Sequence, residues 1–322
     1  MIKYIIKRLL IMIPLVLGIS FIVLILIDLA PGDVAKQIAG AEAEEWQVEQ
    51  IREDLHLNDP LIVRYVRFVG GAFRGSLGKS FITKTDVMGD ILKRFPYTVK
   101  LATMSILLAM LIGIPIGIYA ATHQYSWKDN AAILLSLFSV SMPSFWFALI
   151  LVQLFAVKLG VLPPYGIDDW KGWILPTVSL ALGYTASIAR QTRSNMLEVI
   201  RQDYITTAKA KGVPSYKVLF RHALKNALTP IITVVGGLYG MALGGALVAE
   251  TIFSVPGLGK YTLVALTNRD YPAIQGSVLF ISILHCIVIL LIDILFAFVD
   301  PRIRSQYSRG KKRKSELKGK EA

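Results

Sequence analysis

The sequence predicts an all-α integral membrane protein with six transmembrane helices and both termini in the cytoplasm. Hydrophobic residues make up 54% of the 322 residues and charged residues only 18%, a composition that differs from that of ordinary soluble domains. A helix needs about 20 apolar residues to cross the hydrocarbon core of a bilayer, and six runs approach or exceed that length. Most Lys and Arg residues lie in terminal and connecting segments that would share one side of the membrane, and this predicts the orientation of the helices in the bilayer.

The six apolar runs differ in length and in charge. The first follows Lys3, Lys7 and Arg8 as a signal peptide would, but it is longer than the usual apolar region and no small-residue cleavage site follows. We therefore expect a retained membrane anchor. The fourth run is short, and the sixth contains Asp293. The six runs are residues 9–27, 101–122, 131–157, 174–189, 228–249 and 277–299.

The basic residues decide the orientation, because Lys and Arg near the ends of spans remain in the cytoplasm. With the amino terminus inside, 21 of the 35 basic residues are cytoplasmic beside six acidic residues, whereas 14 of each lie outside. The excess behind the net charge of +13 is therefore cytoplasmic. We expect the basic tail to anchor the topology beside anionic lipid rather than to bind nucleic acid.

The spans and their connections divide the chain into four parts. The external segment is expected to be structured, because residues 43–55 are helix-prone and Asn58-Asp59-Pro60 would start a second helix. It could cap the membrane domain, serve as a platform for a soluble extracytoplasmic partner, or do both. The four parts are a cytoplasmic amino terminus with the first transmembrane helix (1–29), the extracytoplasmic segment (30–100), a core of five transmembrane helices (101–306) and a basic cytoplasmic tail (307–322).

Small residues recur at helical spacing in two spans. Gly236, Gly240 and Gly244 repeat every four residues in the fifth span, as Gly113 and Gly117 do in the second. Such stripes allow helix backbones to approach closely. They predict either packing within one bundle or an interface with a second membrane subunit.

Prolines lie inside three of the predicted spans. Pro115, Pro143 and Pro176 fall in the second, third and fourth spans. Each removes a backbone donor and allows a kink. We therefore expect bends in these helices.

Asp293 is the acid deep within the last span. A charge at the centre of a transmembrane helix costs about 2.5–3.5 kcal/mol unless it is paired or hydrated. We expect Asp293 to form a structural ion pair with Arg190 or Arg193, which lie at the same predicted depth. The other acid at membrane depth, Asp28, lies near the opposite side of the membrane. Asp293 therefore has no nearby acid at membrane depth with which to exchange a proton, and a proton relay is disfavoured.

The sequence predicts no catalytic residue, no metal site and no cofactor in this chain. Residues 257–260 resemble the end of a phosphate-binding loop. However, Ser254 stands where that motif has its first glycine, and Tyr261 stands where it has a magnesium-binding serine or threonine. The zinc-protease and serine-hydrolase motifs do not occur. His285 and Cys286 are neighbours in a predicted helix, where adjacent side chains point about 100° apart.

The most informative segment is the cytoplasmic loop of residues 190–227. It carries eight basic and two acidic residues. A helix, a stop at Gly212 and a second helix beginning at Pro214 are expected. A short basic elbow that also carries aromatic residues such as Tyr204 and Tyr216 is suited to a groove on a cytoplasmic partner.

This loop resembles the cytoplasmic motif of binding-protein-dependent ABC importer permeases. That motif has Glu-Ala-Ala, three residues, a glycine, nine residues and Ile-x-Leu-Pro. Aligned on Gly212, the chain has Ala208 in place but Thr206 and Thr207 for the glutamate and first alanine. The dipeptide, oligopeptide and nickel permease subfamily is matched more closely. The matching runs are 203–212 and 221–227, together with 30–33, 75–80, 250–259, 269–276 and 300–302.

The resemblance implies the architecture of a type I ABC importer transmembrane domain with a structured external insertion after the first helix. It also implies a second permease as heterodimer partner, two cytoplasmic ATPases that hold ATP and magnesium, and an extracytoplasmic binding protein. The chain would be a non-enzymatic, multi-pass protein of a bacterial or archaeal cytoplasmic (inner) membrane. The elements near the amino terminus resemble the first permease of such pairs. Residues expected to dock on an ATPase are Asp203, Tyr204, Thr206, Thr207, Ala208, Lys209, Lys211, Gly212 and Tyr216.

The substrate remains open between several solutes. Dipeptides or oligopeptides are expected first, and the same machinery could import nickel or a metal chelate, glutathione or another small solute. A function of another class is a membrane receptor or scaffold whose basic loop and tail recruit a signalling protein. That function would involve no ATP-dependent uptake.

Overall fold

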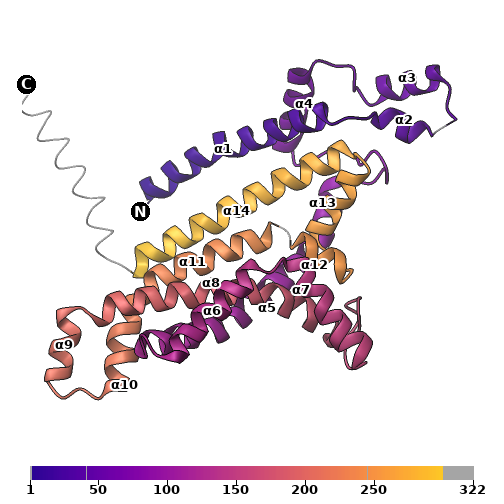
Figure 1. Ribbon diagram of the computed structural model, residues 1–322. Helices are drawn as coiled ribbons and strands as arrows, with labels where there is room; N and C mark the ends of the chain where they lie inside the picture. The colour runs from indigo at the N-terminus through magenta and orange to yellow at the C-terminus, as the bar shows by residue number, and fades with distance from the viewer. Residues whose placement is uncertain (1, 41, 245, 300–322) are drawn as a thin grey trace, which may run out of the picture. The chain divides into compact units, whose positions relative to one another are not determined.

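The computed structural model describes residues 2–40, 42–244 and 246–299, and this part of the chain is helical with a single isolated antiparallel bridge. Figure 1 shows the elements in order. They are α1 (Ile2–Leu29), α2 (Val34–Ala39), α3 (Glu45–Asp54), α4 (Leu61–Phe73), α5 (Val87–Thr122), α6 (Trp127–Ser141), α7 (Ser144–Leu151), the π-helix η1 (Val152–Lys158), the 3-10 helix η2 (Trp170–Trp173), α8 (Ile174–Ile200), α9 (Asp203–Ala210), α10 (Ser215–Lys217), the π-helix η3 (Val218–Leu224), α11 (Lys225–Leu243), α12 (Leu247–Ile252), α13 (Leu258–Thr267) and α14 (Tyr271–Val299).

Five helical segments in the described residues are long and apolar enough to cross a membrane. A sixth forms when Trp127–Ser141 and Ser144–Lys158, which are separated by a break at Met142 and Pro143, count as one broken span. The predicted all-helical fold with six spans is therefore confirmed on this count. The five continuous segments are Ile5–Leu29, Val87–Thr122, Trp170–Ile200, Ser215–Leu243 and Tyr271–Ile294.

The helix ends differ from the predicted ends of the spans. The helix of the second predicted span, α5, begins at Val87, 14 residues before the predicted start at Leu101. Hydropathy marks the apolar part of a helix and does not include its charged first turns. Pro143 breaks the third span completely. Pro176 lies in the first turn of α8, where its missing N–H removes no hydrogen bond within the α-helix. The predicted tail and residues 300–302 lie outside the described residues.

The chain forms two compact units. Among the described residues, the first unit lies within residues 2–104, 144–180 and 241–286, and the second within residues 105–143, 181–240 and 287–299. Helices α5, α8, α11 and α14 contribute residues to both. These units differ from the four sequence segments, because compactness groups residues that are distant along the chain.

In the first unit, the segment that follows α1 is structured and is tied back to α1. Tyr65 of α4 donates a hydrogen bond to the carbonyl oxygen of Leu17 at 2.7 Å, and its ring packs edge-on against Phe21. Arg64 forms an ion pair with Asp28 at 2.6 Å. The helix that the sequence predicted after Pro60 therefore packs on the first span.

The first unit also contains a buried carboxylate. Glu250 is fully buried, and it accepts hydrogen bonds from the Thr98 hydroxyl at 2.7 Å and from the backbone N–H of Lys260 at 2.9 Å. Burial raises the pKa of this carboxyl group, and the donors oppose that shift. Lys260 lies in the first turn of α13, so the carboxylate sits at a helix amino terminus, where an anion is stabilised.

The glycines of residues 257–260 allow this contact. A side chain at Gly257 would overlap the Glu250 carboxylate, and one at Gly259 would lie within 3.0 Å of it. Thr98 also accepts a hydrogen bond from the N–H of Leu258 at 2.8 Å. The segment that resembles a phosphate loop is therefore a helix start that binds a carboxylate of its own chain.

In the second unit, close approach of α5 and α8 depends on two glycines. A side chain at Gly113 would lie 2.8 Å from the carbonyl oxygen of Thr185, and one at Gly117 would lie 2.5 Å from that of Ala189. This is the close approach that the small-residue spacing predicted. Gly236 of α11 likewise lies against Ile292 of α14, which shows that it packs within the chain.

Arg193 pairs with a carboxylate that the sequence pattern did not point to. It forms two hydrogen bonds with Asp129, at 2.6 and 2.7 Å, and Asp129 is buried. This carboxylate lies in the first turn of α6, 64 residues before Arg193. The pairing of Asp293 with Arg190 or Arg193 stays a prediction.

We expect Glu250→Ala to lower the free energy of unfolding by about 3 kcal/mol, because it leaves buried donors without an acceptor. Thermal unfolding of the purified protein in detergent measures this effect, with the exposed Glu53→Ala as the matched control. Equal melting temperatures for the two variants would contradict the role assigned to Glu250.

We expect Asp129→Ala and Arg193→Met each to destabilise the protein by about 3 kcal/mol, because each leaves a charged partner incompletely paired. The double variant should cost clearly less than the sum of the two. A double-mutant cycle on thermal unfolding tests this, and strictly additive effects would show that the pair makes no joint contribution.

Candidate functional site

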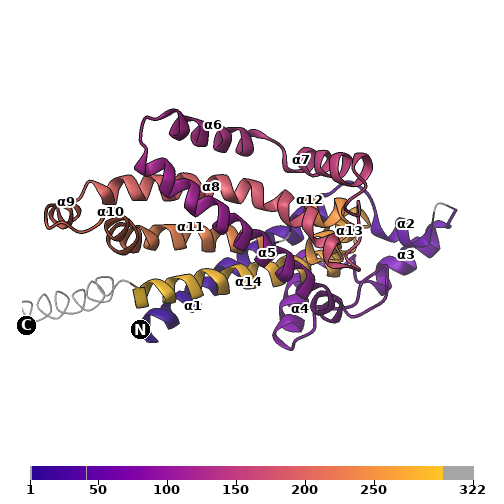
Figure 2. The same cartoon turned by 90° about the horizontal axis from the view of Figure 1, so that it is seen from below.

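The predicted cytoplasmic loop is an elbow in the second unit. Helix α8 continues to Ile200, so the non-spanning part is shorter than predicted and consists of α9, a turn, α10 and η3. Figures 1 and 2 both show α9 and α10 beside each other at the ends of α8 and α11. We call residues 201–224 the elbow.

Gly212 ends α9 in the way that the sequence predicted. Its φ is +75°, in the left-handed region, and its N–H donates to the carbonyl oxygen of Lys209 at 2.9 Å. The N–H of Val213 donates to the carbonyl oxygen of Ala208 at 3.2 Å. These two bonds form a Schellman motif, which turns the chain sharply and satisfies the last carbonyl groups of the helix.

The elbow is attached to the rest of its unit by a buried core. Ile205 is 1% exposed and belongs to one hydrophobic cluster with Met196 of α8 and Val218 and Ala223 of η3. Ile118 at the end of α5 lies in the same cluster. One face of α9 is therefore fixed to the ends of three other helices.

Polar contacts join the elbow to the start of α11 and to the loop after α5. The side-chain N–H of Asn226 donates to the hydroxyl oxygen of Tyr204 at 3.0 Å and to the carbonyl oxygen of His222 at 2.8 Å. Arg201 donates to Gln124 at 3.2 Å in the loop after α5. With the buried core, these bonds make the elbow suited to transmitting a displacement to the helices.

The other face of the elbow is open, basic and aromatic. Tyr204, Tyr216 and Phe220 are 43%, 62% and 57% exposed. Lys209 and Lys211 are exposed at the carboxyl end of α9. Large exposed apolar groups beside cations are typical of a surface that binds another protein.

The structure brings the predicted docking residues together on this one elbow. Ala208 is partly buried and faces the core, whereas the other eight are exposed: Asp203, Tyr204, Thr206, Thr207, Lys209, Lys211, Gly212 and Tyr216. Ile205, which anchors α9, was not among the predicted site residues. The spacing of Ile205 and Ala208, which places both on one helical face, is the signal that could have found it.

Other runs that carry the family resemblance meet in the first unit. Asp270 is buried and accepts hydrogen bonds from the Ser80 hydroxyl and, at 2.9 Å, from the N–H of Phe81. Gly276 lies against Leu77 and Val87. Residues 75–80 therefore dock on residues 269–276, although about 190 residues separate them.

The run at 30–33 meets the same segment. Arg269 donates to the carbonyl oxygen of Pro31, and a side chain at Gly32 would overlap its guanidinium. Gly32 has a φ of +115°, a conformation that favours glycine. Residues 269–276 thus hold two segments from the amino-terminal third of the chain.

Two family profiles match almost the whole chain. Residues 113–305 match the binding-protein-dependent transport system inner membrane component, and residues 1–102 match the amino-terminal part of such membrane components. The elbow lies in the first match, and the segment tied to α1 lies in the second.

Characterised relatives match over nearly their full length. The glutathione transport system permease protein GsiC of Escherichia coli O6:H1 is 37% identical over 304 residues, which cover 94% of this chain and 99% of the relative. GsiC of Salmonella paratyphi A is 38% identical over the same coverage.

The fold also resembles a solved transporter. A chain of the inward-facing MetNI methionine ABC transporter superposes with a TM-score of 0.54 at 17% identity, covering 66% of this chain and 97% of that one. A second crystal form of MetNI gives a TM-score of 0.57 at 16% identity with the same coverage. This likeness supports the fold of an importer permease. The chain belongs to the family of binding-protein-dependent transport system inner membrane components, and it is a multi-pass permease subunit of an ABC importer.

Proposed function

We propose that this permease works in an ATP-driven importer of short peptides and that its elbow receives the motion of a cytoplasmic ATPase. The observation that carries the proposal is the elbow itself, which has a buried face fixed by Ile205 and an exposed basic and aromatic face. The importer would contain a second, different permease, two ATPase subunits and an extracytoplasmic binding protein. ATP and magnesium would be held by the ATPases.

The proposed orientation places both termini and the elbow in the cytoplasm. The distribution of basic residues supports it, because this orientation keeps Lys and Arg near the span ends inside. The helices α2, α3 and α4 would then lie on the extracytoplasmic side. Their position there would make them available to a binding protein.

The coupling step follows from the attachment of α9. Closure of an ATPase pair would move the groove that holds the exposed face of α9. Because Ile205 is buried among α5, α8 and η3, the movement would be passed to those helices rather than absorbed by a loose loop. ATP would thereby bias an equilibrium between inward-open and outward-open arrangements.

The substrate proposal rests on resemblance. The dipeptide and oligopeptide permeases share the sequence runs described above, and the relatives transport glutathione, as their names state. Glutathione is itself a small peptide with free carboxylates. We therefore propose a short peptide or glutathione as the imported solute.

We expect Gly212→Pro to abolish ATP-driven uptake while the protein still inserts into the membrane. Proline fixes φ near −65° and removes the N–H that bonds to Lys209, so the turn cannot form. Gly212→Asn is the matched control, because asparagine tolerates the left-handed conformation. Uptake of labelled peptide by cells and the amount of protein in the membrane are the two readouts. Normal uptake by Gly212→Pro would contradict the coupling role.

We expect the double change Lys209→Glu and Lys211→Glu to prevent copurification of the ATPase subunits without reducing the yield of the permease. Both lysines are exposed, so reversal of their charge should disturb a partner surface rather than the fold. The control reverses Lys158 and Lys171, which are also exposed but belong to the first unit and not to the elbow. Equal recovery of ATPase with the two double variants would contradict the docking assignment.

A further inference from the structure

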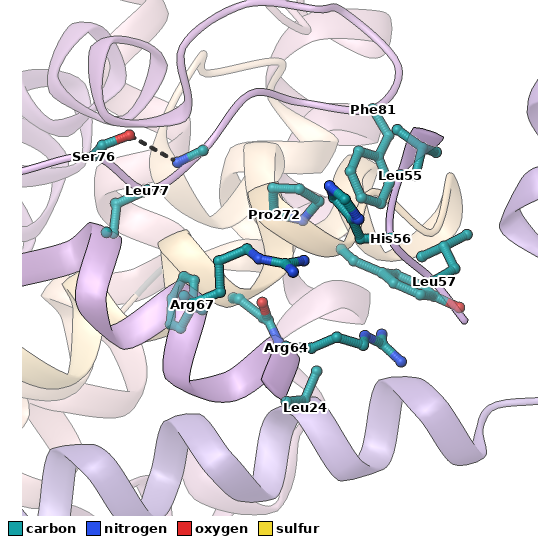
Figure 3. Close-up of a pocket in the computed structure, with 15 residues that line it drawn as sticks. Leu24, Leu55, His56, Leu57, Arg64, Arg67, Ser76, Leu77, Phe81 and Pro272 are labelled. Carbon is teal, nitrogen blue, oxygen red and sulfur yellow. Dashed lines mark hydrogen bonds between the residues drawn. The ribbon is translucent and has the colours of Figure 1, made fainter. Parts of the chain in front are cut away.

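The first unit contains a cavity of about 300 Å³ that the coupling mechanism does not use (Figure 3). It lies between α4, the turn at residues 55–57 before it, the loop at residues 76–81 and the first turns of α14. Its size is near the lower end of the range for small-molecule sites.

One residue that lines this cavity has a buried side-chain nitrogen without a hydrogen-bond partner in the part of the chain that the structure describes. Gln275 of α14 is only 7% exposed, and its side-chain nitrogen has no hydrogen-bond partner. A buried donor without an acceptor is costly, and native proteins rarely leave one unsatisfied. A rotation of the Gln275 side chain towards the cavity would let this nitrogen donate a hydrogen bond to an acceptor group on a bound molecule.

Two arginines of α4 line the same cavity. Arg64 uses one nitrogen to bind Asp28 at 2.6 Å, and Arg67 uses one to bind Asp59 at 2.7 Å. Figure 3 shows the Arg67 side chain extending towards Pro272 and His56. A guanidinium has five N–H donors, so each arginine can also donate hydrogen bonds to a further carboxylate.

Apolar side chains also line the cavity. Leu24 of α1, Leu57, Phe81 and Pro272 line the cavity around its polar groups. The site therefore combines donors of hydrogen bonds with an apolar surface. This combination matches a ligand that carries a carboxylate beside an apolar side chain.

We propose that this cavity binds the carboxyl-terminal residue of a short peptide whose last side chain is apolar. The carboxylate would accept hydrogen bonds from Gln275 and Arg67, and the apolar side chain would contact the wall that includes Leu57 and Phe81. The proposal rests on the proposed function, and it names a substrate class and a first site for it on the permease.

Equilibrium dialysis of the purified transporter complex without its binding protein and without ATP tests the site. The probes are radiolabelled glycyl-leucine, its carboxyl-terminal amide, glycyl-glycine and octanoate. We expect glycyl-leucine to bind, and we expect the amide to bind at least about tenfold more weakly, since a charge-assisted hydrogen bond is lost. Stronger binding of octanoate would identify a fatty acid as the ligand and overturn the proposal.

Substitutions of residues that line the cavity test whether glycyl-leucine binds there. Gln275→Leu and Arg67→Met should each weaken binding of glycyl-leucine and reduce the preference for the acid over the amide. Arg74→Met removes an exposed arginine just beyond α4 that does not line the cavity, and it should bind like the wild type. Unchanged affinity and selectivity in both Gln275→Leu and Arg67→Met would overturn the proposal.

The cavity proposal and the proposed function can fail independently of each other. If the complex carries out ATP-driven peptide uptake but does not bind glycyl-leucine in this assay, the cavity proposal is wrong and the proposed function holds. If the complex binds glycyl-leucine with the expected selectivity but takes up no peptide, the proposed function is wrong and the cavity remains a carboxylate site.

Discussion

The burial of Ile205 is the interaction on which the exposed face of the elbow depends. A helix of eight residues is too short to be stable alone in water, and α9 gains its stability from the apolar contacts of this side chain with α5, α8 and η3. Gly212 then directs the chain away at the end of α9. A buried anchor and a fixed turn together hold the tyrosines and lysines of the elbow in one orientation.

Buried contacts also shape the first unit, where two carboxylates are held by partners from distant segments. Glu250 is satisfied by Thr98 and the start of α13, and Asp270 is satisfied by Ser80 and Phe81. The contacts with Thr98, Ser80 and Phe81 join parts of the chain that lie more than 140 residues apart. Polar bonds thus fix which helices pack together in a protein whose surface is largely apolar.

The sequence predicted the number of spans and the helix, glycine, helix pattern of the elbow, because these depend on local hydropathy and backbone preference. It could not predict the partner of Arg193, since several acids were compatible and only the fold brings Asp129 to it. It also gave no sign that residues 257–260 would bind Glu250. Such contacts depend on tertiary geometry, which a pattern of residue types does not contain.

The central claim is that the elbow contacts a nucleotide-hydrolysing subunit, and photocrosslinking tests it most directly. Cys286 is the single cysteine and is buried, so Cys286→Ser provides a background for one new cysteine. A benzophenone probe at Thr206→Cys should crosslink to a protein that mass spectrometry shows to contain ATP-binding motifs, whereas the same probe at Lys158→Cys should not. Crosslinks from Thr206→Cys only to proteins without such motifs would contradict the claim.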